Sequence, residues 1–220
     1  MKSLIEIFTL KKIPILSWSS SNALNFKPKF LTLFYLVFGL ILFGIGEALL
    51  ITANLGVSPW TVLAQGMSFK SGYSIGVTTL IVSISILFLW IPLRQKPGIG
   101  TILNTISISI ILDLSLPYLP SPELYILQVL QVIIGVIIVG LGSGFYLIAN
   151  LGPGSRDGLM IGLQQKTNLP ISLIRNLIEL SAVILGWYLG GIVGIGTIVF
   201  ALGIGPLVSA GLFFVGRYIK

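Results

Sequence analysis

Long apolar stretches separated by short polar connections dominate the chain. A helix needs about 20 apolar residues to cross the hydrocarbon core of a bilayer. Six stretches meet this requirement, namely Phe30–Ala53, Ser74–Leu93, Ile99–Leu119, Tyr125–Ala149, Ile171–Leu189 and Ile195–Val215. The pattern therefore predicts an all-α membrane protein with about six transmembrane helices.

A second pattern is an internal repeat. A-N-L-G occurs at Ala53 and again at Ala149, and G-I-G-T occurs at Gly98 and again at Gly194. Subtracting 53 from 149, or 98 from 194, gives 96 in both cases. Duplicated hydrophobic halves are typical of membrane transporters. We expect one transmembrane domain over residues 30–216, made of a repeat at about 30–119 and a second at about 123–216.

Parity decides how the two repeats are related. Three spans in each repeat bring the second copy into the membrane from the opposite face, which predicts two inverted three-helix repeats. Each repeat also contains a short segment between its first and second span, Ser58–Phe69 and Ser155–Gln165. Neither segment is long enough to cross a bilayer.

These short segments have clear helix starts. Ser58 is a good N-cap before Pro59, and Gly154–Ser155 is a similar start. Each segment is either a helix on the membrane surface or a re-entrant half-helix, and we favour the re-entrant form. Re-entry would aim two helix N-termini toward the interior from opposite sides, a geometry that binds anionic groups.

Composition supports the membrane interpretation and excludes several other classes. The chain is 55% hydrophobic and only 9% charged, whereas soluble domains carry about 25% charged residues. It has no cysteine and no histidine, so we expect no disulfide, metal site or cofactor. No catalytic constellation is visible, and we do not expect an enzyme. The expected partners are the lipid bilayer and a small-molecule or ion substrate.

The chain has 13 basic and 6 acidic residues, and their placement predicts topology rather than nucleic-acid binding. In the six-span arrangement most basic residues fall on one side of the membrane. They lie in the N-terminal tail, the 94–96 loop, the 156–175 region and the C-terminal tail. The other side receives only Lys70 and Glu123. By the positive-inside rule both termini are cytoplasmic. We expect residues 1–29 to form a cytoplasmic tail rather than a removable signal peptide.

Charged residues inside apolar spans are the main candidates for a site, because burying a charge in hydrocarbon is costly. Arg175 and Glu179 lie four residues apart and therefore share one helix face, and Asn176 extends this polar patch. The pair is either a substrate-binding or ion-coupling pair that faces a cavity or a salt bridge that only stabilises the bundle.

Four further charged residues lie in or near the predicted spans. Arg156 and Asp157 follow the G-P-G-S turn, and they are either ligand-binding residues or a positive-inside marker with a capping acid. Glu47 lies inside the first span, where the second repeat has Ser143. It is either a protonatable coupling group or a neutral structural glutamic acid. Asp113 is expected to be interfacial.

Small and turn-forming residues precede both half-helices. Asn54 and Gly56 in the first repeat match Asn150 and Gly152 in the second. Asparagine and glycine at these positions are typical of helix C-caps, and we prefer this interpretation to a role in binding.

The chain resembles the YczE/YyaS/YitT group of bacterial integral membrane proteins, and the YczE branch most closely. The stretches that carry the resemblance are Gly39–Gly46, Ala53–Trp60, Lys96–Thr101, Arg156–Met160, Arg175–Glu179, Leu189–Thr197 and Ile204–Pro206. One departure is Ser155, where the family often has proline before R-D-G. The resemblance implies a multi-spanning protein of a bacterial cytoplasmic membrane and supplies no substrate.

Together these features favour a small secondary transporter or permease for a small polar or charged solute. Arg156 and Arg175 would hold an anionic group, and Glu179, Asp157 or Glu47 would hold a cation or proton. A zwitterion would suit both signs. The alternatives are a membrane scaffold or regulator that acts through a protein partner and, less favoured, a channel.

Overall fold

The computed structural model describes residues 13–219, so the predicted tail of residues 1–29 lies partly outside the described part of the chain. The described secondary structure is entirely helical. In chain order the elements are α2 (Phe30–Thr52), α3 (Pro59–Ser71), α4 (Ile75–Trp90), α5 (Ile99–Ser115), the 3-10 turn η1 (Leu116–Tyr118), α6 (Tyr125–Ala149), α7 (Ser155–Thr167), α8 (Ile171–Tyr188) and α9 (Ile195–Tyr218).

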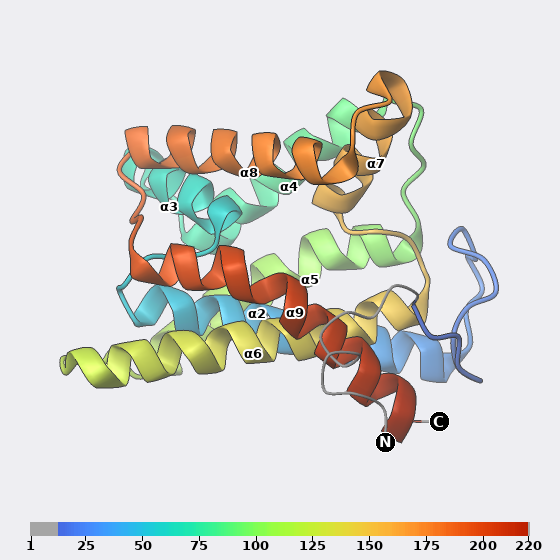
Figure 1. Cartoon of the computed structure of the whole chain (residues 1–220), viewed down its shortest axis with the longest axis horizontal. Coiled ribbons are helices and arrows are strands. Elements are labelled where there is room, and N and C mark those ends of the chain that lie inside the picture. Colours follow the sequence, from blue (N-terminus) through green and yellow to red (C-terminus); the bar gives the residue numbers. More distant parts are fainter. Residues whose placement is uncertain (1–12, 220) are drawn as a thin grey trace.

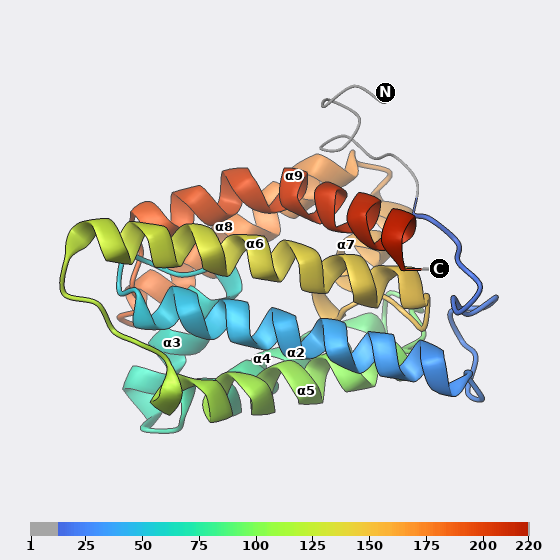
Figure 2. The same cartoon turned by 90° about the horizontal axis from the view of Figure 1, so that it is seen from below.

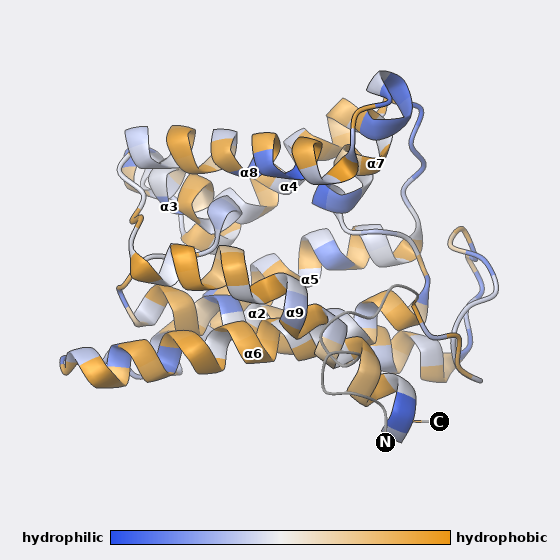
Figure 3. Cartoon of the chain, viewed as in Figure 1, coloured by the Kyte–Doolittle hydropathy of each residue, from blue (hydrophilic) through white to orange (hydrophobic). Residues whose placement is uncertain are grey.

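Five helices in the described residues are long and apolar enough to cross a membrane. They are α2, α5 with η1, α6, α8 and α9. A sixth span exists if α3 and α4, which meet at a bend of 117°, count as one broken span. Figure 3 shows apolar colour along most turns of α6, α8 and α9 and a mixture of hydrophilic and apolar colour at α7.

The predicted second span is shorter in the structure than in the sequence pattern. The apolar stretch Ser74–Leu93 forms helix only from Ile75 to Trp90, which is 16 residues or about 24 Å at 1.5 Å per residue. Pro92 explains the early end, because proline has no backbone N–H to continue the hydrogen-bond ladder of the helix, and Ile91 N–H already turns to the carbonyl of Phe88, three residues back.

The helices form two layers. α5, α2, α6 and α9 lie side by side in one layer (Figure 2), and α3, α4, α7 and α8 form the other (Figure 1). Within the second layer α3 packs on α8 and α4 packs on α7. α3 and α7 themselves lie toward opposite ends of the molecule (Figure 1).

Three pairs of helices begin 96 residues apart: α3 and α7 at 59 and 155, α4 and α8 at 75 and 171, and α5 and α9 at 99 and 195. The matching starts of α5 and α9 have a local cause, a hydrogen bond at the N-terminus of each helix. Gly98 N–H donates to the Thr101 hydroxyl at 3.2 Å, and Gly194 N–H donates to the Thr197 hydroxyl at 3.3 Å. The G-I-G-T motif thus caps a helix in both places.

Contacts between the two halves occur twice with the partners exchanged. Gly100 N–H donates to the carbonyl of Leu151 at 2.7 Å, and Gly196 N–H donates to the carbonyl of Leu55 at 2.7 Å. Residues 100 and 196, like residues 55 and 151, are 96 positions apart. Each half therefore uses its A-N-L-G turn to hold the first turn of the last helix in the other half.

α2 and α6, one from each half, also pack closely against each other. A side chain at Gly39 would meet the carbonyl of Gly142, and one at Gly46 would meet that of Gly135. The partner number falls as the first number rises, so α2 and α6 run antiparallel. Small residues at such crossings allow two helix backbones to approach closely.

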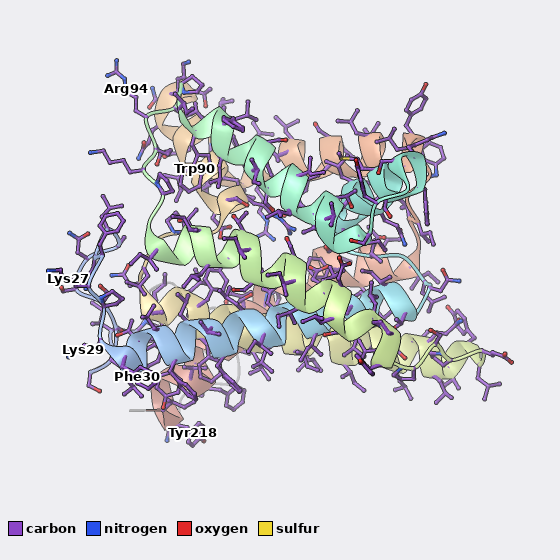
Figure 4. All side chains as sticks on the ribbon, turned by 180° about the vertical axis from the view of Figure 1, so that it is seen from behind. Lys27, Lys29, Phe30, Trp90, Arg94 and Tyr218 are labelled. Atoms are coloured by element: carbon purple, nitrogen blue, oxygen red, sulfur yellow. The ribbon has the colours of Figure 1, made fainter. Side chains whose placement is uncertain are left out.

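Basic residues outside the helices gather at one end of the molecule. Lys27, Lys29 and Arg94 all lie at the same end in Figure 4, although Arg94 is far from the two lysines in sequence. This clustering is what the positive-inside argument requires, and which side of the membrane this end faces stays a prediction.

Candidate functional site

A cavity of about 330 Å³ lies between the two layers, and all eight helices described above contribute to its lining. This volume is at the lower end of the range of small-molecule sites. The lining consists of Phe43, Pro59, Trp60, Thr79, Ser83, Asn104, Thr105, Ile108, Ser143, Tyr146, Leu147, Gly154, Ser155, Arg156, Asp157, Met160, Arg175, Glu179, Phe200, Ile204, Gly205 and Val208.

Two helix N-termini reach this cavity because sharp turns redirect the chain after α2 and α6. Asn54 and Asn150 have left-handed φ values of 55° and 51°, which asparagine tolerates better than most residues. Gly56 and Gly152 have φ values of 101° and 112°, which favour glycine. α3 and α7 then begin at the cavity wall, where the first turn of a helix has unpaired backbone N–H groups.

Arg156 and Trp60 meet at the cavity. The guanidinium carbon of Arg156 lies 5.3 Å from the centroid of the Trp60 ring, a cation–π contact. The two residues occupy equivalent positions 96 residues apart, in the first turns of α7 and α3. Among the described residues Arg156 forms no salt bridge and no side-chain hydrogen bond, so its five donors are available to a ligand.

The other charged groups in the lining already have partners. Arg175 Nε donates to Glu179 Oε1 at 2.8 Å, with side chains 42% and 21% exposed. Asp157 Oδ2 accepts a hydrogen bond from the Tyr146 hydroxyl at 2.9 Å. Arg156 is therefore the cation of the cavity whose charge is least compensated by a direct contact.

The charges come from only one half of the chain. On α4 the residues equivalent to Arg175 and Glu179 are Thr79 and Ser83, which also line the cavity. Thr79 donates its hydroxyl to the Ile75 carbonyl in its own helix. Equivalent backbone positions thus present a charged wall on α7 and α8 and an uncharged wall on α3 and α4.

Glu47 lies beside this cavity rather than in its lining. Its side chain is 1% exposed. Its Oε2 accepts hydrogen bonds from the Ser58 hydroxyl and the Thr61 hydroxyl, both at 2.8 Å. Ser58 and Thr61 flank Trp60 at the start of α3, so Glu47 helps to hold the residue on which Arg156 lies.

Two residues considered in the sequence lie elsewhere. Asn176 is exposed and does not line the cavity, because one residue turns a helix by about 100° from Arg175. Asp113 accepts hydrogen bonds from the Ser74 hydroxyl and from Gly76 N–H, at 2.7 Å for the latter. It therefore caps the start of α4.

Trp60 and Tyr146, the two aromatic residues that contact charged side chains of the site, were not predicted. Trp60 could have been found from the repeat, because it aligns with Arg156 in the other copy. Tyr146 carried no such signal, because its equivalent position is Leu50 and an aromatic residue inside an apolar span is ordinary.

Comparison with known proteins identifies the family. Residues 30–211 match the family described as "Family of unknown function (DUF6198)". The chain belongs to this family. It is 36% identical over 208 residues to an "Uncharacterized protein" of Haemophilus influenzae, covering 94% of each chain. It is 33% identical over 166 residues to the "Uncharacterized membrane protein YczE" of Bacillus subtilis, covering 74% of this chain and 77% of that one.

A third relative is the "Uncharacterized protein YyaS" of Bacillus subtilis, 27% identical over 169 residues and covering 74% of this chain and 84% of that one. No solved structure matches the chain. These relatives confirm the YczE and YyaS resemblance found in the sequence. With the five to six apolar helices of membrane-spanning length, they identify an integral membrane protein.

Proposed function

We propose that this protein is a secondary transporter that binds a small organic anion in the central cavity. The observation that carries the proposal is Arg156, a half-buried cation that lines the cavity without a salt-bridge partner among the described residues. A charge without a directly bonded partner is costly in an apolar environment. An anionic ligand would supply the missing partner.

The surroundings of Arg156 favour an anion further. It lies in the first turn of α7, where the helix dipole and free backbone N–H groups attract negative charge. A second such N-terminus, that of α3, lies at the same cavity. Arginine presents a planar fork that matches a carboxylate or phosphate in a bidentate manner.

The rest of the lining limits the size and character of the solute. A cavity of about 330 Å³ suits a small metabolite rather than a polymer. Phe43, Trp60 and Phe200 provide apolar surface. Asp157 on the same wall provides an acceptor for an ammonium group, so an anion with an apolar body and a zwitterion both fit.

The arrangement of the helices supports transport rather than simple binding. The exchanged contacts at Leu55 and Leu151 and the antiparallel crossing of α2 with α6 are those expected of two inverted repeats. In such proteins the site lies between the repeats, and access alternates as one part rocks against the other. A cavity lined by all eight described helices fits that position.

The first test is a thermal-stabilisation screen of the purified protein against carboxylates, phosphates, sulfonates and amino acids. A ligand that binds only the folded protein stabilises it by about 2.7 kcal/mol at a hundredfold excess over Kd. We expect a stabilising anion whose effect disappears in Arg156→Gln. Arg217→Gln is the matched control, because Arg217 also lies over an aromatic ring, that of Phe213, and does not line the cavity.

The ligand found in this screen is then used for uptake into proteoliposomes. Saturable uptake that is lost in Arg156→Gln and retained in Arg217→Gln supports the transporter. No stabilisation by any anion, with both variants as well folded as the parent, would contradict the proposal and favour a scaffold that binds a protein partner.

A further inference from the structure

The start of α3 contains two buried polar atoms without partners. They are Glu47 Oε1 and Trp60 Nε1, and no other buried side-chain N or O atom in the described residues lacks a hydrogen bond. Glu47 contacts the two hydroxyls that flank Trp60 in sequence. The unsatisfied groups of this fold therefore gather at one place, beside the candidate anion site.

The hydrogen atoms around Glu47 can be counted. Glu47 Oε2, Ser58 Oγ and Thr61 Oγ1 form a triangle with sides of 2.8, 2.8 and 3.0 Å. All three sides are hydrogen-bond distances. The two hydroxyls supply one proton each, and an ionised carboxylate supplies none. The two hydroxyl protons can form two of these three hydrogen bonds, and a proton on the carboxyl group would form the third.

The unpartnered Oε1 atom leads to the same conclusion. A buried carboxylate oxygen with no donor carries a large desolvation penalty, whereas the carbonyl oxygen of a neutral carboxyl group carries a smaller one. Three features oppose this and favour the ionised form, namely the hydroxyl groups that donate to Oε2, the N-terminus of α3 and the charge of Arg156. The neutral and the ionised form of Glu47 therefore each have surroundings in this structure that favour them.

We propose that Glu47 is a proton-binding site linked to the anion site at Arg156, so that proton and anion bind together. This inference rests on the proposed function and adds the coupling ion to it. A proton from solvent binds the carboxylate and removes its negative charge. Arg156 then loses a compensating charge and binds an anion more tightly. By linkage, the bound anion raises the affinity for the proton by the same factor.

The other charged and titratable groups near the cavity are already engaged. α6 contributes Tyr146, which donates to Asp157 of α7. α8 contributes Arg175 and Glu179, which pair with each other. On α5, Asp113 caps α4. α3 presents only hydroxyls to Glu47, and Arg156 is the charged group that acts on it.

The proton itself is tested first, without any ligand. Infrared difference spectra of the purified protein are recorded across a pH titration, and the C=O stretch of a protonated carboxyl group is followed. We expect a band from a group shielded from solvent that is absent in Glu47→Gln and unchanged in Glu123→Gln, which alters an exposed acid outside the cavity. A spectrum with the same carboxyl bands in both variants overturns the inference.

Coupling is tested with benzenesulfonate, an anion with an apolar ring whose charge stays constant over the pH range. We expect its Kd to rise with pH by up to about tenfold per unit in the parent protein, the limit for one linked proton. In Glu47→Gln the affinity is high and independent of pH. Equal pH dependence in parent and variant overturns the coupling.

Failure of the proposed function gives a different result. If benzenesulfonate and the anions of the screen bind neither parent nor Glu47→Gln at any pH, the anion site is wrong. Because coupling needs both ligands, it then fails too, and the infrared titration still decides separately whether Glu47 holds a proton.

Discussion

The first turns of α3 and α7 occupy equivalent positions at the cavity but carry different chemistry. Both follow an asparagine and a glycine with positive φ, and both begin at the cavity wall. α3 presents Trp60 and receives its negative charge from Glu47 on a different helix. α7 presents Arg156 and has an acid, Asp157, in its own first turn.

This comparison distinguishes the features that the two repeats share from the features in which they differ. Turns, helix starts and close backbone contacts match in the two halves, because a change in one would break the packing of both. Side chains that face the cavity are free to differ. All four charged residues of the lining come from α7 and α8, and the matching positions on α3 and α4 are uncharged.

The largest expected effect concerns the shared turns. We expect Gly56→Ala and Gly152→Ala to destabilise the protein to a similar extent, because both have positive φ and no space for a side chain. An added Cβ would lie 2.5 Å from Gly194 N and 2.7 Å from Thr101 Oγ1, respectively. Backbone strain alone costs about 1–3 kcal/mol, and the clash adds to it.

Thermal unfolding in detergent and the yield of monodisperse protein measure this effect. Gly205→Ala is the control, because nothing lies within 4 Å of an added Cβ there and alanine favours helix by up to about 1 kcal/mol. A large loss at one turn and none at the other would show that the two halves are not held by equivalent contacts.

The next largest effect is a difference in stability between substitutions at Glu47 and at its counterpart Ser143. Glu47→Ala removes the shared acceptor of two buried hydroxyls, and we expect a loss of about 1–3 kcal/mol in unfolding free energy. Ser143 donates only to the Val139 carbonyl in its own helix, so Ser143→Ala is expected to cost less than about 0.5 kcal/mol. Denaturant titration of both variants measures the difference, and equal losses would contradict it.

A smaller effect is expected at Trp60, measured as anion affinity with the ligand found in the screen. Trp60→Leu removes the ring beneath Arg156, and a cation–π contact is worth about 0.5–2 kcal/mol, or about 2- to 30-fold in Kd. Trp60→Phe keeps a π face and should retain most of the affinity. Loss of affinity as complete as in Arg156→Gln would mean that Trp60 contacts the ligand directly.

Much of the fold could be predicted from the sequence because its signals are local or repeated. Apolar length predicted the spans, and the 96-residue spacing predicted matching helix starts. The short α4 was predicted less well, because hydropathy continues to Leu93 while proline chemistry ends the helix at Trp90. Whether α3 and α7 are re-entrant stays a prediction, since it depends on where the membrane surface lies.

The candidate site was predicted only in part. Arg156, Asp157, Arg175 and Glu179 could be named because charge is rare in this chain. Their roles could not be ranked, because spacing along a helix reveals the Arg175–Glu179 pair but not the contact of Arg156 with Trp60 from another helix. Sequence spacing cannot reveal which charge is left without a partner in three dimensions.

The smallest expected effect tests whether Arg156 rather than Arg175 is the main anion-binding residue. Arg175 is already paired with Glu179 at 2.8 Å and its side chain is 42% exposed, and such pairs contribute about 0.2–1 kcal/mol. We expect Arg175→Gln to change anion affinity by less than about threefold, much less than Arg156→Gln. Thr79→Ala, at the equivalent position of α4, should hardly change the affinity at all.

Isothermal titration of the three variants with the ligand from the screen measures this order. If Arg175→Gln abolishes binding while Arg156→Gln retains it, the anion lies against α8 instead of the first turn of α7, and the salt bridge has to open when the ligand enters.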